Sequence, residues 1–320
     1  DNNDLFHNKP PESFPGKLTR LLYHRYKFFN GNPSKVVHII PCELIDKNGN
    51  KLKKIILDLC KIWRLEKDFI SWIEKNHFYN SLVDRIVPGY PKKDFEFYKK
   101  DLPFDDQLIV TCEPFFLWVI EGNPKLLEYF PVNELDNIDV KIVPDIGIYR
   151  TRKVRILNGS HTTMVPVGLL SGTLTVSEIL QVDFLQDFLY HTLFDEIIPS
   201  IDFNKKELED YAQSVLERFS NPFIIHQLES ISLNSISKFK VRVLPSLLSY
   251  FKKEAKVPKN LTFSLAALIY FYGKDVSKHN YQLHDDPKNI TFFNSIWRNN
   301  KNEKVVIETL SNRELWGENL

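Results

Sequence analysis

The chain has 320 residues, of which 43% are hydrophobic and 26% are charged. This composition is typical of a soluble globular protein and excludes an intrinsically disordered chain. The 42 basic and 41 acidic residues leave a formal net charge of +1. The basic surplus that marks most nucleic-acid-binding proteins is therefore absent, and no nucleic-acid partner is expected.

Three cysteines, Cys42, Cys60 and Cys112, are odd in number and far apart in the sequence. Each has apolar neighbours, so we expect buried, reduced thiols in a reducing compartment. The sequence contains no CxxC pair, and no histidine pair with metal-ligand spacing stands near a cysteine, which argues against a metal site. No apolar run is long enough to cross a bilayer, and the polar start does not resemble a signal peptide. We therefore predict a cytoplasmic protein without a metal or a membrane partner.

Residues 1–150 alternate strand-like and helical patterns. Short apolar runs predict strands at 36–40, 82–87 and 108–112, the first of them buried and parallel, and helical spacing predicts a helix at 52–63 after a turn at 48–50. This alternation is typical of an open α/β sheet. The first part of the chain is therefore predicted to be an α/β domain.

Residues 151–320 are predicted to form a mainly α-helical domain. The residues Thr175 to Glu178 have the pattern of a capping box, which predicts a helix of roughly 20 residues towards Ile198. Asn204 is placed to begin another helix that ends near Phe219. Helical spacing returns at 226–235, 238–253 and 261–272. The change in pattern places the domain boundary near residue 150.

The eleven glycines include no GxG pair, so the sequence has no dinucleotide-binding GxGxxG fingerprint. Two interpretations follow. Either the protein binds no dinucleotide, or the phosphate-binding strand–turn–helix unit precedes residue 1.

Lys153, Asn158 and His161 form the most informative group of polar residues. On an α-helix that turns about 100° per residue, Asn158 lies ~140° and His161 ~80° from Lys153. Apolar residues share this arc, whereas Arg155, Gly159 and Thr162 lie opposite. The three polar side chains are thus expected on a buried face, where polar groups are costly unless they are paired or used.

A buried lysine loses part of its preference for the charged form, so its pKa should fall towards the range of an acid–base catalyst. An asparagine and a histidine beside it are able to bind the oxygen of a ketone or an alkoxide. A second interpretation is structural: Lys153 extends to solvent at the helix start, and Asn158 and His161 are satisfied core residues. Spacing alone does not separate these two interpretations.

A second polar group lies at 80–85, beside an expected strand. Asp84 and Arg85 interrupt the apolar run and are interpreted as a structural ion pair at the strand end. Asn80 stands at the start of the run. It is either a sheet-edge residue or a ligand of the substrate, because ligand sites in α/β sheets form at strand ends.

These segments resemble the mannitol dehydrogenase family of polyol-specific long-chain dehydrogenases. Lys153, Asn158 and His161 match its KxxxxNxxH motif, and the residues 80–87, 112–121 and 221–226 match further motifs. The resemblance covers nearly the whole chain. It implies an incomplete Rossmann-like dinucleotide-binding domain at 1–150, whose glycine-rich start is absent, and an α-helical substrate and catalytic domain at 151–320.

The resemblance implies a role for each matched residue. Lys153 is the general acid in ketone reduction and the general base in the reverse direction, without a metal. Asn80 and Asn158 hydrogen-bond the developing alkoxide, and His161 holds the carbonyl or a neighbouring hydroxyl. NAD is the implied cofactor, although its main phosphate-binding residues are not in this chain.

Three segments, 13–19, 40–46 and 88–91, resemble the branch of the family that reduces the keto-uronate tagaturonate to altronate in hexuronate breakdown. Polyol enzymes tend to carry arginine where this chain has Ser230. The implied partner is therefore a small sugar acid. Fructuronate reductase and mannitol dehydrogenase activities are alternatives within the family, and a non-catalytic binding fragment is an alternative outside it. A monomer and a dimer are both compatible with the sequence.

Three residues of the helical half are candidate substrate ligands. Lys238 matches a basic pocket position of the family, where a cation suits a uronate carboxylate; otherwise it is a helix-surface lysine. Arg242, one helical turn on, is a further candidate, although a solvated surface position is the preferred interpretation for it. His226 either lines the pocket or caps a helix.

Overall fold

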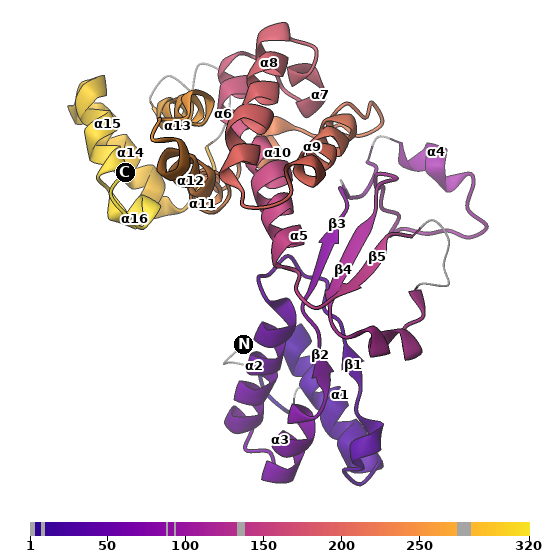
Figure 1. Cartoon of the computed structure of the whole chain (residues 1–320). Coiled ribbons are helices and arrows are strands. Elements are labelled where there is room, and N and C mark those ends of the chain that lie inside the picture. The colour runs from indigo at the N-terminus through magenta and orange to yellow at the C-terminus, as the bar shows by residue number, and fades with distance from the viewer. Residues whose placement is uncertain (1–3, 8–9, 88, 93, 133–137, 274–282) are drawn as a thin grey trace. The chain divides into compact units, whose positions relative to one another are not determined.

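In the computed structural model of the chain, the described residues are 4–7, 10–87, 89–92, 94–132, 138–273 and 283–320. The chain divides into two compact units (Figure 1). Unit 1 comprises residues 1–85 and 115–149, and unit 2 comprises residues 86–114 and 150–320. The sequence led us to expect a single boundary near residue 150, but the segment 86–114 clusters with the second unit.

The described part of unit 1 combines α-helices, the short 3-10 helices η1 (Pro33–Lys35) and η2 (Pro124–Glu128), and two small sheets. The α-helices are α1 (Phe14–Phe28), α2 (Asn48–Ile62) and α3 (Lys67–Glu74), and the strands are β1 (His38–Ile39), β2 (His77–Phe78), β3 (Ser81–Asp84), β4 (Leu117–Glu121) and β5 (Val140–Val143). Strand β1 pairs with β2 in parallel, and β4 pairs in parallel with β5 and antiparallel with β3. This α/β unit, followed by a helical one, confirms the predicted fold class.

The turn predicted at 48–50 is wrong, because helix α2 begins at Asn48. The Asn48 amide is buried and donates hydrogen bonds to the carbonyl oxygens of Pro41 (2.9 Å) and Ser81 (3.0 Å), while its oxygen accepts from the backbone N–H of Ser81 (2.9 Å) and Gly49 (2.9 Å). These long-range bonds hold the helix start against β3. Local turn propensity is therefore overridden by a tertiary contact.

The strand predicted at 108–112 is also wrong. This stretch belongs to unit 2, where Thr111 forms an isolated bridge with Gly89, and Leu108 is 85% exposed.

The expected burial of the cysteines holds for Cys60, whose thiol pKa is raised to about 12 by burial. Cys42 and Cys112 are exposed, because both lie in surface segments outside the helices and strands.

Unit 2 is helical. Its elements are α4 (Phe95–Lys99), α5 (Gly147–Arg152, which spans the change of unit), η4 (Lys153–Asn158), α6 (Gly159–Leu170), α7 (Val176–Ile179), α8 (Asp183–His191), η5 (Thr192–Ile197), η6 (Ile198–Ser200), α9 (Lys205–Phe219), α10 (Leu228–Ser232), α11 (Ser235–Arg242), α12 (Leu244–Glu254), α13 (Lys259–Phe271), α14 (Pro287–Asn299), α15 (Asn302–Leu310) and α16 (Arg313–Trp316). The segments η4 and η5 are π-helical.

Two helix starts are confirmed. The Thr175–Glu178 capping box is formed, and Asn204 caps α9 by accepting a hydrogen bond from the backbone N–H of Glu207. The long helix expected after the capping box is wrong, however. Helix α7 ends at Ile179, and α8 begins afresh at Asp183 and continues into η5.

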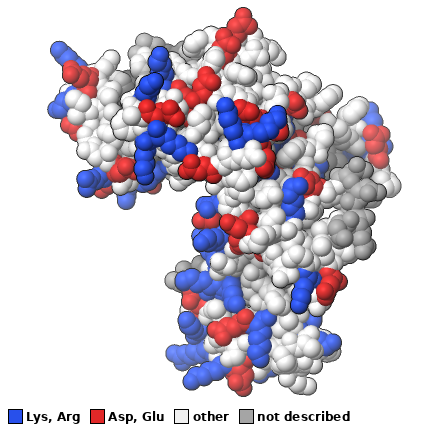
Figure 2. All heavy atoms as spheres, in the orientation of Figure 1, with Lys and Arg blue, Asp and Glu red and all other residues white. Residues whose placement is uncertain are grey.

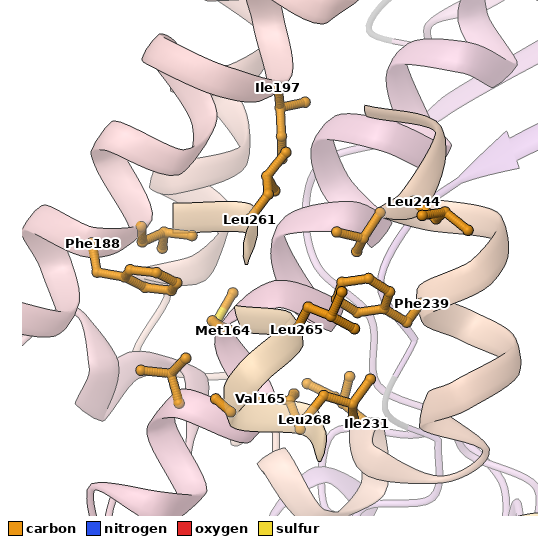
Figure 3. Packing of buried hydrophobic residues seen from close by; sticks show 14 of the residues in the cluster. Met164, Val165, Phe188, Ile197, Ile231, Phe239, Leu244, Leu261, Leu265 and Leu268 are labelled. Carbon is orange, nitrogen blue, oxygen red and sulfur yellow. The ribbon is translucent and has the colours of Figure 1, made fainter. Parts of the chain in front are cut away.

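Helix α6 is the centre of unit 2, and every residue from Gly159 to Leu169 is buried. Helices α8, α10, α11 and α13 contact it. Figure 3 shows Met164 and Val165 of α6 among the leucines of α13 and Phe239 of α11. Burial of each such large apolar side chain contributes about 1.5–3 kcal/mol to stability. Helix α6 is therefore fixed by packing on all sides.

A buried ion pair attaches the segment 86–114 to the helices of unit 2. The Arg218 guanidinium donates to both carboxylate oxygens of Glu113, at 3.0 and 2.8 Å, and the two side chains are 6% and 1% exposed. The same carboxylate accepts a hydrogen bond from the backbone N–H of Ile86. Both ends of the segment thus meet at Glu113.

Basic and acidic side chains alternate on the face drawn in Figure 2. Among the residues that the structure describes, no helix is long and apolar enough to span a membrane.

Replacing Arg218 with Met is expected to lower the free energy of unfolding by about 3–5 kcal/mol, because Glu113 is left buried without its counter-ion. Urea denaturation measures this loss. The matched control is Lys205→Met on the same helix, where Lys205 is exposed and forms a 3.5 Å surface pair with Glu209. This control should change stability by less than about 1 kcal/mol. Equal effects of the two substitutions would contradict a structural role for the buried pair.

Candidate active site

Lys153, Asn158 and His161 lie on one continuous helix formed by α5, η4 and α6 (Figure 1). The backbone stays helical at both junctions, at Arg152 and at Gly159. Between them, η4 is a π-helix, in which hydrogen bonds join residues five apart. The regular turn of about 100° per residue expected for this stretch is therefore wrong.

The π-helix changes which side chains share a face. Residues four apart lie above one another where hydrogen bonds span four residues, and residues five apart do so where they span five. Lys153 and Asn158 are five apart and bound the π-helical segment. Asn158 and His161 are three apart at the start of α6, which again places them on one side. The spacing of the three residues thus fits this helix better than a uniform α-helix.

The helix face that was expected to lie opposite Lys153, Asn158 and His161 is not exposed to solvent. Gly159 and Thr162 are buried, and Arg155 is half-buried. A Cβ atom on Gly159 would lie 3.2 Å from the Arg242 carbonyl oxygen, so this position brings α11 close to α6. The hydroxyls of Thr162 and Thr163 donate to the carbonyl oxygens four residues earlier. The helix is therefore buried all round, and its polar side chains depend on internal partners.

His161 is 6% exposed, and its Nε2 atom has no hydrogen-bond partner among the described residues. Its ring packs on Phe219 with centroids 4.3 Å apart and meets the edge of His226 at 4.9 Å. Burial lowers the pKa of His161 well below its usual value, and the charges of His226, Arg242, Arg218 and Lys238 add to this effect. His161 is neutral at neutral pH, with one ring nitrogen available for a ligand.

Two half-buried cations of α11 face the same region. Lys238 donates to the carbonyl oxygen of Ile231 at 2.8 Å, and burial together with the Arg242 charge lowers the pKa of Lys238 to about 8. Arg242 donates to the Thr162 hydroxyl at 3.4 Å, and burial lowers its pKa. The solvated surface position preferred for Arg242 is thus wrong. In the described part of the chain, neither cation forms an ion pair, although Asp285 acts on Lys238 from a longer distance.

Asn80 lies in unit 1 and is described there by its own contacts. Its side-chain oxygen accepts from the backbone N–H of Asn50 at 3.1 Å, and its amide donates to Glu121 at 2.6 Å. A primary amide has two N–H donors, so these contacts leave one for another ligand.

In the same unit, Asp84 is buried and Arg85 lies over the ring of Phe116 at 5.5 Å. The expected Asp84–Arg85 ion pair stays a prediction.

Unit 2 brings together most of the predicted site residues. Lys153, Asn158 and His161 share a helix, His226 contacts the His161 ring, and the charges of Lys238 and Arg242 act on that ring. Sequence reasoning missed Phe219, which contacts His161, and the Glu113–Arg218 pair beside it. Position in the sequence is the signal that could have found the pair: Glu113 lies within the matched segment 112–121, and Arg218 lies three residues before the segment 221–226. Among the described residues, no group of three or more metal-ligating side chains is formed; the absence of a metal stays a prediction.

Two family models together match most of this chain. The mannitol dehydrogenase C-terminal domain matches residues 145–320, and the mannitol dehydrogenase Rossmann domain matches residues 11–129. Altronate oxidoreductase of Bacillus subtilis (strain 168) is 43% identical over the whole of this chain, and that of Phocaeicola vulgatus is 42% identical over 97% of it. The chain spans 66% and 65% of the lengths of these two relatives.

Solved structures share the fold. Pseudomonas fluorescens mannitol 2-dehydrogenase, in a ternary complex with NAD and D-mannitol, matches 96% of this chain and 60% of its own length, with a TM-score of 0.68 and 22% identity. A substrate-free D-sorbitol dehydrogenase matches 95% of this chain and 66% of its own length, with a TM-score of 0.71 and 21% identity. At this level of identity the likeness concerns the fold.

The buried, neutral histidines predict a pH-dependent stability. The unfolded chain protonates histidine near pH 6.5, whereas His161 and His226 resist protonation in the folded state. The unfolded state therefore binds more protons below this pH, and stability falls as the pH is lowered, by up to about 1.4 kcal/mol per pH unit for each histidine.

Urea unfolding between pH 7.5 and pH 5 tests this prediction. His161→Gln should flatten the dependence, and the same change at the exposed His24 should leave it unaltered. An unchanged slope in His161→Gln would show that His161 is not held neutral.

Proposed function

Because this chain belongs to the mannitol dehydrogenase family, we propose that its protein is an oxidoreductase that reduces the keto-uronate tagaturonate to altronate with NADH. The observation that carries this proposal is the Nε2 atom of the buried His161, which has no hydrogen-bond partner among the described residues, while the charges of Lys238 and Arg242 on α11 lower the pKa of its ring. Such an atom costs about 1–3 kcal/mol unless a ligand binds it.

Lys153 is the proposed general acid. The chemistry that a bound nicotinamide cofactor would supply is hydride transfer to the carbonyl carbon. The Lys153 ammonium gives its proton to the carbonyl oxygen as the C=O double bond becomes a C–O single bond, and neutral lysine takes the proton back in the reverse direction. Its position, 9% exposed at the start of the π-helix, supports this role.

Asn158 and His161 are the proposed donors to the oxygen that gains negative charge, and for Asn80 the role implied by the family stays a prediction. A neutral histidine and an amide donate hydrogen bonds without delivering a proton, which suits electrostatic stabilisation of an alkoxide. The low pKa of His161 supports its use as a hydrogen-bond donor instead of an acid. The reaction then needs no metal, because these donors polarise the carbonyl.

The substrate carboxylate is assigned to Lys238, with Arg242 beside it. Two half-buried cations without an ion-pair partner in the described part of the chain favour an anionic ligand. A keto-uronate supplies one carboxylate, whereas mannitol and fructose supply none. The names of the relatives that are 42–43% identical support the same substrate class.

The cofactor assignment rests on the family and on the fold. The parallel pair β1–β2 lies within the residues that match the mannitol dehydrogenase Rossmann domain, but the sequence has no GxG pair to approach a pyrophosphate. The residues of this chain thus fit the substrate half of the reaction, and they do not include the main phosphate-binding turn.

Lys153→Ala, made in the protein at its natural length, is expected to lower turnover of tagaturonate by about 10²–10⁴-fold, because the proton donor is lost. Calorimetric titration should show NADH binding close to that of the unchanged protein. Near-normal turnover in this variant would contradict the assigned role. Absence of NADH binding to the unchanged protein would instead favour a non-catalytic binding function.

Lys238→Met is expected to raise KM for tagaturonate by about 10–100-fold, the effect of a lost hydrogen bond to a charged group. Activity on neutral fructose should change little. Because Lys238 loses its proton as the pH rises through about 8, KM of the unchanged enzyme for tagaturonate should rise above that pH.

Steady-state kinetics with tagaturonate, fructuronate and fructose measure these effects. The control is Lys240→Met on the same helix, since the Lys240 side chain lies beside Gly317. Equal activity of the unchanged enzyme on fructose and tagaturonate would remove Lys238 as a carboxylate ligand.

A further inference from the structure

The π-helical segment η4 needs tertiary support. Isolated π-turns are rare, and they occur mostly as single turns at functional sites. Here one such turn separates Lys153 from Asn158, and its hydrogen-bond pattern sets the angle between them. Any group that holds η4 in the π conformation therefore controls the geometry of the proposed proton donor and its oxygen-binding partner.

Arg155, in the middle of η4, makes such contacts. Its guanidinium donates to the hydroxyl of Ser200 at 2.6 Å and to the hydroxyl of Ser246 at 2.8 Å. It also donates to the carbonyl oxygens of Ser200 at 3.3 Å and Pro245 at 3.2 Å. One side chain thus joins η4 to the end of η6 and the start of α12.

The acceptors around Arg155 are themselves fixed. Ser200 and Ser246 are 1% and 0% exposed. The Ser200 hydroxyl also donates to the carbonyl oxygen of Ile197, at the end of the second π-helix, and the Ser249 hydroxyl donates to the carbonyl oxygen of Ser200 at 2.7 Å. Arg155 therefore binds a rigid, neutral set of oxygens, and burial lowers its pKa to about 10.

We propose that Arg155 is a positioning residue that holds η4 as a π-helix and so places Lys153 and Asn158 on one face. This inference rests on the proposed function of those two residues. Arg155 lies two residues after Lys153 and three before Asn158, and its side chain reaches Ser200 and Ser246. It acts through the backbone, without touching the reacting atoms.

The guanidinium is suited to this task because its planar fork donates several hydrogen bonds in fixed directions. A lysine keeps the charge but has one donor atom, so it cannot reach the hydroxyls of Ser200 and Ser246 and the Pro245 carbonyl with the same geometry. A methionine keeps the length and removes every donor. The three side chains therefore form a graded series at one position.

The test compares Arg155→Lys and Arg155→Met in the protein at its natural length. We expect kcat for tagaturonate to fall by about 10-fold in Arg155→Lys and by about 100-fold in Arg155→Met. A displacement of about 1 Å in a catalytic group lowers the rate by about 100-fold, and lysine should allow a smaller displacement than methionine. KM and NADH affinity should stay within about twofold of those of the unchanged enzyme. The solvent deuterium isotope effect on kcat should rise, since proton transfer from a displaced Lys153 becomes slower.

Arg298→Met is the matched control, because Arg298 is exposed on α14 and this change should alter none of these quantities. Ser246→Ala removes one acceptor and is the milder variant: it should lower kcat in the same direction and be non-additive with Arg155→Met. Hydrogen exchange of the amides of η4 should become faster in Arg155→Met.

The outcomes separate the two proposals. If Lys153→Ala abolishes turnover and Arg155→Met keeps normal kcat, or lowers it without a change in the isotope effect and in the exchange of η4, the positioning role is wrong. If Lys153→Ala keeps its turnover, the proposed function fails first. A fall in kcat with constant KM, a larger isotope effect and faster exchange of η4 supports the positioning role.

Discussion

The burial of a single helix governs unit 2. Residues 159–169 of α6 are enclosed by other helices, so water cannot satisfy the polar groups that they carry. The hydroxyls of Thr162 and Thr163 donate hydrogen bonds to carbonyl oxygens of the same continuous helix. The Nε2 atom of His161 has no hydrogen-bond partner among the described residues. On α6, this buried side-chain atom is the one to which we assign a ligand.

The buried or half-buried cations near α6 differ in how their charge is compensated. Arg218 is neutralised by the buried Glu113, and Arg155 is held by neutral oxygens. Among the described residues, Lys238 and Arg242 form no ion pair: each donates to one neutral oxygen, and the Asp285 charge acts on Lys238 from a longer distance. Positive charge is therefore left over beside a buried histidine, which is why the proposed substrate is an anion.

Much of this arrangement could be predicted from the sequence. The helix starts at Thr175 and Asn204 follow from local capping chemistry, and the motif residues Lys153, Asn158 and His161 lie on one helix as expected. What failed depends on distant partners. The π-helix is accompanied by contacts from Arg155 to Ser200 and Ser246, 45 and 91 residues away, and local spacing carries no record of them.

The same limit explains the errors in unit 1. Asn48 begins a helix instead of a turn because Ser81, 33 residues later, shares its hydrogen bonds. Residues 108–112 have the composition of a strand but lack strand neighbours in the described part of unit 2. Local character could be read from the sequence in each case, as turn-forming residues at 48–50 and as apolar residues at 108–112, whereas the partner that decides the conformation could not.

The path of the chain between the units has a consequence for modular architecture. The polypeptide changes unit after residues 85, 114 and 149, so three covalent connections join the units where a simple tandem arrangement has one. A cut at residue 150 would release a helical fragment without Glu113 and would strand the Arg218 charge in its interior. The two units therefore cannot be exchanged between relatives by a single crossover at residue 150. A recombinant would have to receive the segment 86–114 together with the helices of unit 2.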